Sequence, residues 1–371
     1  MMKGLLVWSH SFCRSTVAFY EGLARAFDVP MRMLFWMRGF SNRTAVGYSG
    51  NEFEHLDMRF IGDDLGAAHE EYAAHRHWHH LFGTYQKGVV FRRMLLQVSK
   101  EGGHAAIATE APCNMQPFPR SLLKECFIST ALRHKVTQHV RVADFVVNFS
   151  GDDDGNLRRI GWPVAKVVPC GYYSPPLVGS VLTPRTSTHW RDFWVLMTGR
   201  HQWHRDPMVL LKALTILAGR GVRCRTVVSQ DGPLLPEMQR YAGRHGLDVE
   251  FAGFVSYERL LELYQECTCF VGTGRAEPWG IRVNDALHCG APLAISEGMG
   301  AVKLVRDYAC GFSFPRRDAA ALAANLEDLI RDEKHYLRCA TAVCRAAAEC
   351  RPFVKAGAVA ATIQRRFPGW S

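Results

Sequence analysis

The sequence predicts an α/β protein built on parallel sheets. Short apolar runs alternate with amphipathic stretches of helical length along most of the 371 residues, as expected for parallel strands joined by helices. Apolar residues make up 48% and charged residues 22%, which is an ordinary globular composition. The length is sufficient for two domains with separate cores. We therefore expect two facing Rossmann-like domains with a ligand-binding cleft between them.

The second half of the chain carries this alternation most regularly. Longer stretches with apolar residues every three or four positions favour helices, and short apolar runs favour strands. Strands are expected at 193–199, 222–229, 249–255, 268–273 and 292–296. Helices are expected at 206–219, 235–244, 256–266, from the turn at 277–280 to residue 290, and at 318–333, with two further helical stretches after them. This order predicts a Rossmann-like domain.

The first half repeats the theme less regularly. Strands are expected at 3–8, 30–37, 105–109, 145–150 and 165–169, and helices at 16–26, 69–99 and 122–140. The segment 171–188 contains three prolines and is the predicted linker. We expect an N-terminal domain at 1–175, a C-terminal domain at 176–355, and a C-terminal helix at 356–371 that packs back on the N-terminal domain.

The chain is basic, with a formal net charge of +10. Half of this excess lies in residues 87–144, which hold nine basic and four acidic residues. Such a charge favours nucleotide phosphates, nucleic acid or an anionic membrane face as partners. The stretch is typical of solvated helix faces, and with Phe91, Met94, Leu95 and Leu96 it is also compatible with a contact to anionic lipid.

The sequence predicts neither a membrane span nor a secretory leader. No apolar run approaches the roughly 20 residues that span a bilayer, and the first residues resemble a strand. The 12 cysteines include no Cys-x-x-Cys pair, which favours buried thiols in a reducing cytosol over zinc ligands or a disulfide scaffold. We expect a cytoplasmic protein, with a peripheral contact at the inner face of the plasma membrane.

Residues 275–292 are the most informative segment. They follow an apolar run and begin with a turn that contains Glu277, Pro278, Trp279 and Gly280, before a predicted helix. The first N–H groups of a helix lack intrahelical partners and carry partial positive charge, so such a turn is a candidate phosphate site. A carboxylate there would repel a bare phosphate. A sugar attached to the phosphate would account for Glu277, because a carboxylate can bind sugar hydroxyls.

Two arginines follow the first strand of the same domain. Arg200 and Arg205 are expected at the carboxyl end of that strand, and guanidinium groups suit a diphosphate because they bind it in bidentate fashion and keep their charge. Gly232 allows close backbone approach in a later turn, and the segment 251–255 can present an apolar wall to a nucleobase. The alternative interpretations are an ordinary surface loop for the two arginines and a core strand for residues 251–255.

Together these segments resemble the retaining glycosyltransferases of GT-B fold, which are related to sucrose and glycogen synthases and build many bacterial surface glycans. The resemblance runs in order over about 193–335. Two positions depart from the family pattern: Arg205-Asp206 stands where Lys-Gly is usual, and Asp285 stands where Glu is usual. The matching motifs are Gly199-Arg200 with Arg205, Gly232-Pro233, Phe251-Ala-Gly253-Phe-Val255, Glu277-Pro-Trp-Gly280 with Asp285, and Cys289-Gly-Ala-Pro292.

The resemblance implies a role for each matching residue. Glu277 would bind the donor sugar near the reacting carbon, and Arg200 and Arg205 would neutralise the departing diphosphate. Asp285 would bind the ribose, and its spacing of eight residues from Glu277 predicts that both carboxylates share one helix face. The remaining implied donor-binding positions are Gly199, Gly232, Phe254, Val255, Pro278, Trp279, Gly280 and Ile281.

The first domain is expected to bind the acceptor, and it matches the family poorly. His10, Ser11 and Glu110 follow expected strands and are the candidate acceptor-side residues, with surface turns as the alternative. His75 and His79 have the spacing of a metal pair on a helix, but no third ligand stands out, so a polar helix face is the preferred interpretation.

The activity implied is transfer of a sugar from a nucleoside-diphosphate sugar to a glycan or lipid-linked acceptor with retention of configuration, in synthesis of surface polysaccharide or lipopolysaccharide. No cofactor or metal ion is expected. A sugar-nucleotide epimerase or hydrolase of the same fold is one alternative. A nucleic-acid-binding protein is the alternative from another class. The basic charge favours it, but the sequence contains no recognisable nucleic-acid-binding motif. A nicotinamide-dependent oxidoreductase is disfavoured because no Gly-x-Gly-x-x-Gly follows the first strand.

Overall fold

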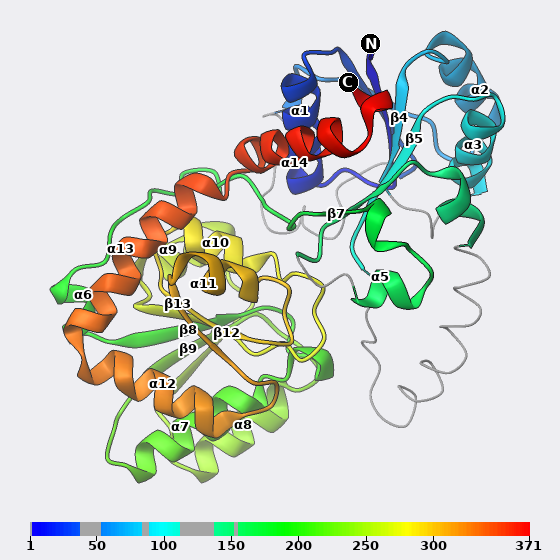
Figure 1. Ribbon diagram of the computed structural model, residues 1–371. Coiled ribbons are helices and arrows are strands. Elements are labelled where there is room, and N and C mark those ends of the chain that lie inside the picture. The colour runs from blue at the N-terminus through cyan, green and yellow to red at the C-terminus, as the bar shows by residue number, and fades with distance from the viewer. Residues whose placement is uncertain (1, 38–52, 84–88, 112–136, 152–154) are drawn as a thin grey trace. The chain divides into compact units, whose positions relative to one another are not determined.

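The computed structural model describes residues 2–37, 53–83, 89–111, 137–151 and 155–371 of the chain (Figure 1). These residues form two units. The first comprises the described residues up to Pro175 together with Arg351–Ser371, and the second comprises Pro176–Cys350. Each unit holds one parallel sheet with helices packed against it, which confirms the predicted α/β class with two parallel sheets.

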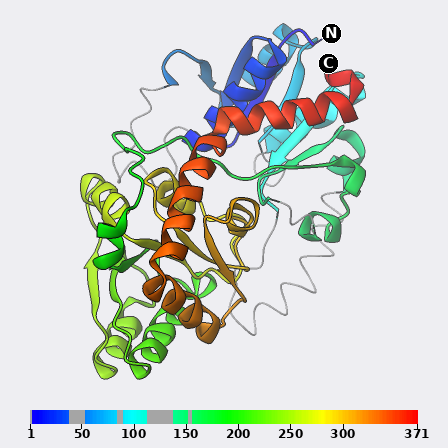
Figure 2. The ribbon, with the colours of Figure 1, turned by 60° about the vertical axis from the view of Figure 1, so that its left-hand side comes forward.

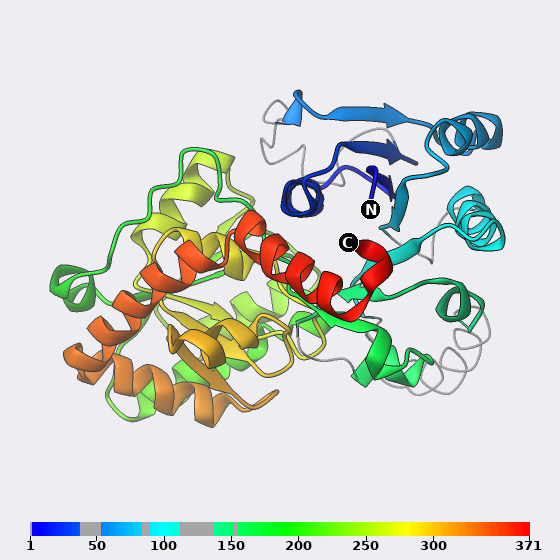
Figure 3. The same cartoon turned by 45° about the horizontal axis from the view of Figure 1, so that its top comes forward.

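The described part of the first unit contains a parallel sheet of seven strands in the order β3-β2-β1-β4-β5-β6-β7. Leu6 and Trp8 of β1 join a core with residues of α2 and α3, and the alternating residues Leu5 and Val7 are also fully buried. Helices α2 and α3 lie on one side of this sheet, and α1 and α14 lie on the other (Figure 3). The strands are β1 (Leu5–Ser9), β2 (Met31–Phe35), β3 (Asp57–Phe60), β4 (His79–Phe82), β5 (Ala105–Thr109), β6 (Val146–Asn148) and β7 (Val167–Pro169). The helices are α1 (Arg14–Phe27), α2 (Leu65–Ala74), α3 (Val89–Lys100), α5 (Gly155–Arg159) and α14 (Pro352–Arg366).

The second unit contains a parallel sheet of six strands in the order β10-β9-β8-β11-β12-β13. Helices α7, α8 and α12 cover one face, and α9, α10 and α11 lie on the other (Figure 1). The strands are β8 (Trp194–Thr198), β9 (Arg225–Ser229), β10 (Val249–Gly253), β11 (Cys269–Gly272), β12 (Leu293–Ser296) and β13 (Gly311–Phe314). The helices are α6 (Ser187–Arg191), α7 (Met208–Gly219), α8 (Leu235–Arg244), α9 (Tyr257–Glu266), α10 (Arg282–His288), α11 (Val302–Tyr308), α12 (Ala319–Arg331) and α13 (Glu333–Glu349).

The second unit follows the predicted order of elements closely. Helix α8 has the predicted bounds, and Ser256 caps α9 by accepting a hydrogen bond from the N–H of Arg259 at 3.2 Å. The sequence does not predict α6, α11 or β13. Each of them is only four to seven residues long, which is too short for a periodic pattern to show.

The helix predicted at 69–99 is wrong. Helix α2 ends at Ala74 with His75 as its C-cap, and a new strand, β4, begins at His79. His75 and His79 therefore do not share a helix, which removes the metal pair. Because β4 lies between β1 and β5, both His79 and His80 are buried instead of forming a polar helix face.

The apolar residues of α3 that the sequence analysis associated with a lipid contact do not form an exposed apolar face. Phe91, Met94 and Leu95 are buried in the core of the first unit, and Leu96 is half-buried. In the part of the chain that the structure describes, no helix is both long and apolar enough to cross a bilayer. Most of the helix predicted at 122–140 lies outside the described residues.

The last helix of the described chain belongs to the first unit. Helix α14 lies along α1 (Figure 2), and the two backbones approach closely at Gly22. A Cβ atom at Gly22 would lie 2.7 Å from the Cβ of Ala356 and 3.1 Å from the Cα of Phe353. The absence of a side chain at position 22 therefore sets the spacing of these two helices.

We predict that Gly22→Ala destabilises the protein by about 1–3 kcal/mol, because the added methyl group forces α1 and α14 apart. Gly357→Ala is the matched control: a Cβ there meets nothing within 4 Å, so the change should stabilise α14 by about 0.5–1 kcal/mol. Urea denaturation measures both effects. Equal stability of the two variants would contradict the close packing of these helices.

A second prediction concerns acid stability. Burial lowers the pKa of His80 to about 3, and Nδ1 of His80 accepts a hydrogen bond from the Trp8 indole at 3.2 Å. Since the unfolded state takes up a proton below about pH 6.5 and the folded state does not, His80 costs stability as the pH falls through this range. Between pH 7.5 and pH 5.0, the free energy of unfolding of His80→Phe should therefore fall by about 2 kcal/mol less than that of the wild type.

The free energy of unfolding from urea titrations at the two pH values checks this difference. His69→Phe, at an exposed position of α2, should keep the acid sensitivity of the wild type. The same loss in His80→Phe and in the wild type would show that His80 does not resist protonation.

Candidate functional site

A pocket lies at the carboxyl edge of the second sheet, where the strand order reverses between β8 and β11. Such switch points bind ligands in open α/β sheets. The pocket encloses about 410 Å³ of space between its atoms, open solvent at its mouth included. It is lined by Met197, Thr198, Gly199, His201, Arg205, Pro207, Phe270, Val271, Gly272, Thr273, Gly274, Glu277, Gly280, Arg282, Val283 and Met299.

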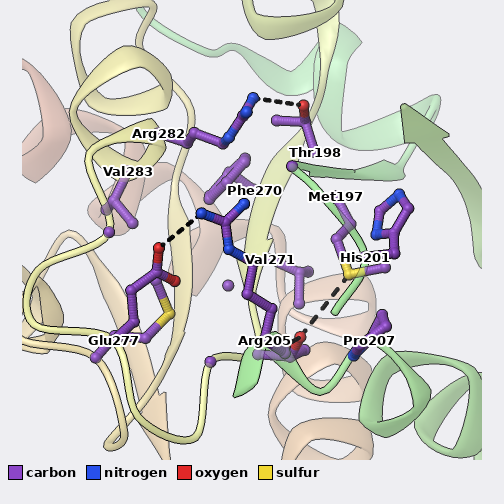
Figure 4. Close-up of a pocket in the computed structure, with 16 residues that line it drawn as sticks. Met197, Thr198, His201, Arg205, Pro207, Phe270, Val271, Glu277, Arg282 and Val283 are labelled. Carbon is purple, nitrogen blue, oxygen red and sulfur yellow. Dashed lines mark hydrogen bonds and ion pairs between the residues drawn. The ribbon is translucent and has the colours of Figure 1, made fainter. Parts of the chain in front are cut away.

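Glu277 and Arg205 converge in this pocket from two different loops (Figure 4). Oε1 of Glu277 lies 3.4 Å from Nη2 of Arg205, and both side chains are only partly exposed. The backbone of Glu277 is fixed from both sides: its N–H donates to Gly298 at 2.9 Å, and its carbonyl accepts from Gly300 at 3.1 Å. A carboxylate and a guanidinium are therefore held side by side at the C-terminal strand ends.

The loop that carries Arg205 is fastened to the loop after β11. Asp206 adopts a left-handed conformation with φ of 43°, and its carboxylate pairs with Nη2 of Arg275 at 2.7 Å. The guanidinium of Arg275 lies 4.4 Å from the ring centre of Trp203, and the backbone N–H of Arg275 donates to the carbonyl of His204 at 2.9 Å. Thr273 adds a hydrogen bond from Oγ1 to the carbonyl of Arg205 at 2.7 Å. These contacts fix the backbone from which Arg205 reaches Glu277.

Arg282 is a pocket residue that sequence reasoning missed. It begins α10, and its Nη1 donates to Oγ1 of Thr198 at 3.3 Å, beside Gly199 (Figure 4). The sequence could have identified Arg282 as a pocket residue by its position two residues after Gly280, at the start of the predicted helix.

His201 is the second missed residue of the pocket. Burial lowers the pKa of His201 to about 4, and nearby Arg282 and Arg205 add to this effect, so the imidazole is neutral near pH 7. Its Nε2 donates to the carbonyl of Ser229 at 3.1 Å. Gly232 packs directly on the His201 backbone, where a Cβ atom would clash. The sequence identified Gly232 for its close backbone approach, but the neighbour it approaches is His201, and Gly232 is not a pocket-lining residue.

The structure brings four of the predicted donor-side residues to the pocket: Gly199, Arg205, Glu277 and Gly280. Arg200 is exposed outside the pocket lining, and so is Phe254, whose side chain is 62% exposed. The other predicted donor-side residues that do not line it are Val255, Pro278, Trp279, Ile281 and Asp285. Trp279 is buried, and its indole N–H donates to Oδ1 of Asn284 at 3.3 Å.

The prediction that Glu277 and Asp285 share a helix face is wrong. Helix α10 begins at Arg282, so Asp285 lies on it while Glu277 precedes it and forms a bridge with Met299. The helix starts late because the turn after Glu277 continues through Gly280, whose φ is 99°. Asp285 is buried within α10.

The predicted acceptor-side residues lie in the first unit. His10 and Ser11 follow β1, and the ring of His10 packs 4.8 Å from that of Trp36. Glu110 is exposed directly after β5. Among the residues that the structure describes, no group of three His, Cys, Asp or Glu side chains is placed to hold a metal ion.

Comparison with known proteins connects this geometry to a family. Residues 187–343 match the model of the family described as glycosyl transferases group 1. A GDP-mannose-dependent alpha-(1-6)-phosphatidylinositol dimannoside mannosyltransferase of Mycobacterium tuberculosis is 26% identical over 203 residues, which are 53% of this chain and 52% of that protein. The chain thus spans about half the length of this curated relative.

Solved structures resemble the whole chain in fold. The crystal structure of Anabaena HepE in complex with UDP has a TM-score of 0.70 at 16% identity and covers 98% of this chain and 100% of its own. The lipopolysaccharide outer core galactosyltransferase WaaB in its apo form has a TM-score of 0.68 at 12% identity, covering 97% and 99%. The chain therefore has the GT-B fold, and residues 187–343, which contain the whole pocket, match the glycosyl transferases group 1 family.

Proposed function

We propose that this protein is a glycosyltransferase that moves a sugar from a nucleoside-diphosphate sugar to a glycan or lipid-linked saccharide, with retention of anomeric configuration. The observation that carries the proposal is the pairing of Glu277 with Arg205 in a pocket at the strand switch point, inside the group 1 domain. One carboxylate and one guanidinium side by side suit a ligand with sugar hydroxyls at one end and phosphate at the other.

The chemistry requires the bond between the anomeric carbon and the phosphate oxygen to break while an acceptor hydroxyl oxygen takes its place. The electron pair of the broken bond leaves with the nucleoside diphosphate, so negative charge develops at the phosphate. In our proposal Arg205 and Arg200 stabilise that charge, and Glu277 binds the sugar. The partly buried position of Arg205 and Glu277 strengthens such interactions relative to water.

We propose UDP or GDP as the nucleotide of the donor and a surface polysaccharide or lipopolysaccharide precursor as the acceptor. The Anabaena neighbour binds UDP, the mycobacterial relative is GDP-mannose-dependent, and the names of the relative and of WaaB specify lipid-linked or lipopolysaccharide acceptors. His10, Ser11 and Glu110 remain our candidates for acceptor contacts, and Asp285 our candidate for the ribose.

We also propose a cytoplasmic protein with a peripheral contact to anionic lipid. The support is electrostatic, because the apolar residues of α3 are buried. Arg92, Arg93 and Lys100 of α3 are all exposed, and so is Arg141. Each basic residue near an anionic surface contributes about 1 kcal/mol to such a contact.

The proposed activity is tested by incubating the full chain with UDP-glucose, UDP-galactose, UDP-N-acetylglucosamine and GDP-mannose. Release of nucleoside diphosphate is followed with and without saccharide acceptors, and donor binding is measured by calorimetry. Release that depends on Glu277 supports the proposal. If no donor binds, and the wild type and Glu277→Ala release nucleotide equally slowly, the proposed function is wrong.

We predict that Glu277→Gln lowers sugar transfer, or hydrolysis of the donor, by about 100-fold or more, because the neutral amide no longer presents a negative charge to the sugar. Binding of the free nucleoside diphosphate should be unchanged or tighter, since a negative charge near the phosphates is removed. Glu250→Gln is the control, because Glu250 is exposed outside the pocket lining and forms an ion pair with Arg225. Loss of nucleotide binding together with activity would contradict the sugar-binding role.

We predict that Asp206→Asn lowers kcat/KM about tenfold and costs about 1–3 kcal/mol of stability, because it leaves the guanidinium of Arg275 without its carboxylate and loosens the loop of Arg205. Asparagine tolerates the left-handed backbone, so the ion pair is the main change. Glu297→Gln is the control, because Glu297 forms an exposed ion pair with Arg306. This change should lower neither kcat/KM nor stability. Steady-state kinetics and urea denaturation are the measurements, and unchanged kcat/KM with reduced stability would show that the loop does not position Arg205.

A further inference from the structure

Two guanidinium groups converge on Gly199 in the pocket. A Cβ atom at this position would lie 2.8 Å from Nη1 of Arg205 and 3.1 Å from Nε of Arg282, so both nitrogen atoms lie close to one point. Gly199 has a φ of 129°, a conformation that side chains other than glycine rarely adopt. The missing side chain leaves room for both cations above the end of β8.

The two arginines differ in their partners. Arg205 forms an ion pair with Glu277, whereas Arg282 donates to the neutral hydroxyl of Thr198. In the described part of the chain, Arg282 takes part in no ion pair within 4.0 Å. It is half-buried and lines the same pocket as Arg205, with its guanidinium at the Thr198 hydroxyl (Figure 4). Like charges at this spacing repel one another, and an anion between them removes the repulsion.

The other side chains of the pocket favour a multivalent anion. His201 is neutral and buried beside the arginines, so it neither adds charge nor competes for it. Thr198 supplies a hydroxyl, which can bind a phosphate oxygen as well as Arg282. Two planar guanidiniums match the charge and the oxygen spacing of a diphosphate better than those of an uncharged sugar, and among the described residues only Arg205 of the two has a carboxylate partner.

We propose that Arg282 is a donor-binding residue that contacts the diphosphate of the nucleotide, as a second cation beside Arg205. This inference rests on the proposed function. It adds a residue outside the motifs that relate this chain to the family. Glu277 then lies on the sugar side of the pocket, and Arg205, Arg282, Thr198 and Gly199 lie on the phosphate side.

The same guanidinium could instead bind a carboxylate on the donor sugar, such as that of a uronic acid. The two alternatives differ in what remains when the sugar is removed. A contact to the diphosphate persists with free UDP or GDP, while a contact to a sugar carboxylate does not. Free nucleotides are therefore the decisive probes.

The experiment measures binding of UDP, GDP, uridine and guanosine to the full chain by isothermal titration calorimetry. The variants are Arg282→Gln, Arg282→Lys and Arg306→Gln. Arg306→Gln removes the same charge from the same unit outside the pocket lining. Thermal melting confirms that each variant is folded, and Arg282→Lys keeps a positive charge if the glutamine variant is unstable.

We expect Arg282→Gln to weaken binding of whichever of UDP and GDP the wild type binds by about 10- to 100-fold, because a charge-assisted hydrogen bond to phosphate is lost. Nucleoside binding should be unchanged. Arg282→Lys should recover part of the loss, because a point charge replaces a bidentate one. Arg306→Gln should bind like the wild type.

Two outcomes overturn the inference alone. One is a wild type that binds UDP or GDP while Arg282→Gln binds it equally well. The other is an Arg282→Gln variant that loses nucleoside and nucleoside diphosphate affinity equally, which would show a general disturbance of the pocket. A wild type that binds neither UDP nor GDP overturns the proposed function, and this inference with it.

Discussion

The reversal of strand order between β8 and β11 is the constraint on which the site depends. β8 pairs with β9 on one side and with β11 on the other, and the chain continues from β8 and from β11 in opposite directions across the sheet. The two loops diverge at the carboxyl edge and leave a space that neither fills. Thr198 lines this space from one strand end and Thr273 from the other. The sheet therefore sets the place where the two loops that carry Arg205 and Glu277 begin.

The loops are then held in register by the ion pair of Asp206 with Arg275. A left-handed backbone normally favours glycine, which is the residue usual at this position in the family pattern. This chain places Asp206 there, and the buried contact to Arg275 offsets the strain of that conformation. Arg275 also stacks on Trp203 and donates to the His204 carbonyl. The departure from the pattern is thus matched by a second residue that ties the Arg205 loop to the turn of Glu277.

The sequence predicts the second unit far better than the first. Long amphipathic helices and apolar strands identify β8 to β12, and the order of motifs predicts that Arg205 and Glu277 meet. The periodicity of apolar residues does not predict the elements within 69–99 correctly. The strand β4 between α2 and α3 has only four residues, and two of them are histidines, which are not typical of a core strand. Periodicity also fails to find Arg282, since the turn through Gly280 delays the start of α10 and determines the reach of that side chain. Such contacts depend on tertiary geometry that single-sequence patterns do not contain.

The charge balance of the pocket explains why the phosphate site that we propose can include Glu277. The charged side chains among its lining residues are Arg205, Arg282 and Glu277, and burial keeps His201 neutral. With Arg205 alone, the carboxylate would cancel the guanidinium and the pocket would offer no net attraction to a diphosphate. Arg282 leaves the pocket with one net positive charge before any ligand arrives. A ligand that binds Glu277 through neutral hydroxyls and both arginines through phosphate oxygens gives each of these side chains a new partner. A bare phosphate or a bare sugar cannot do so.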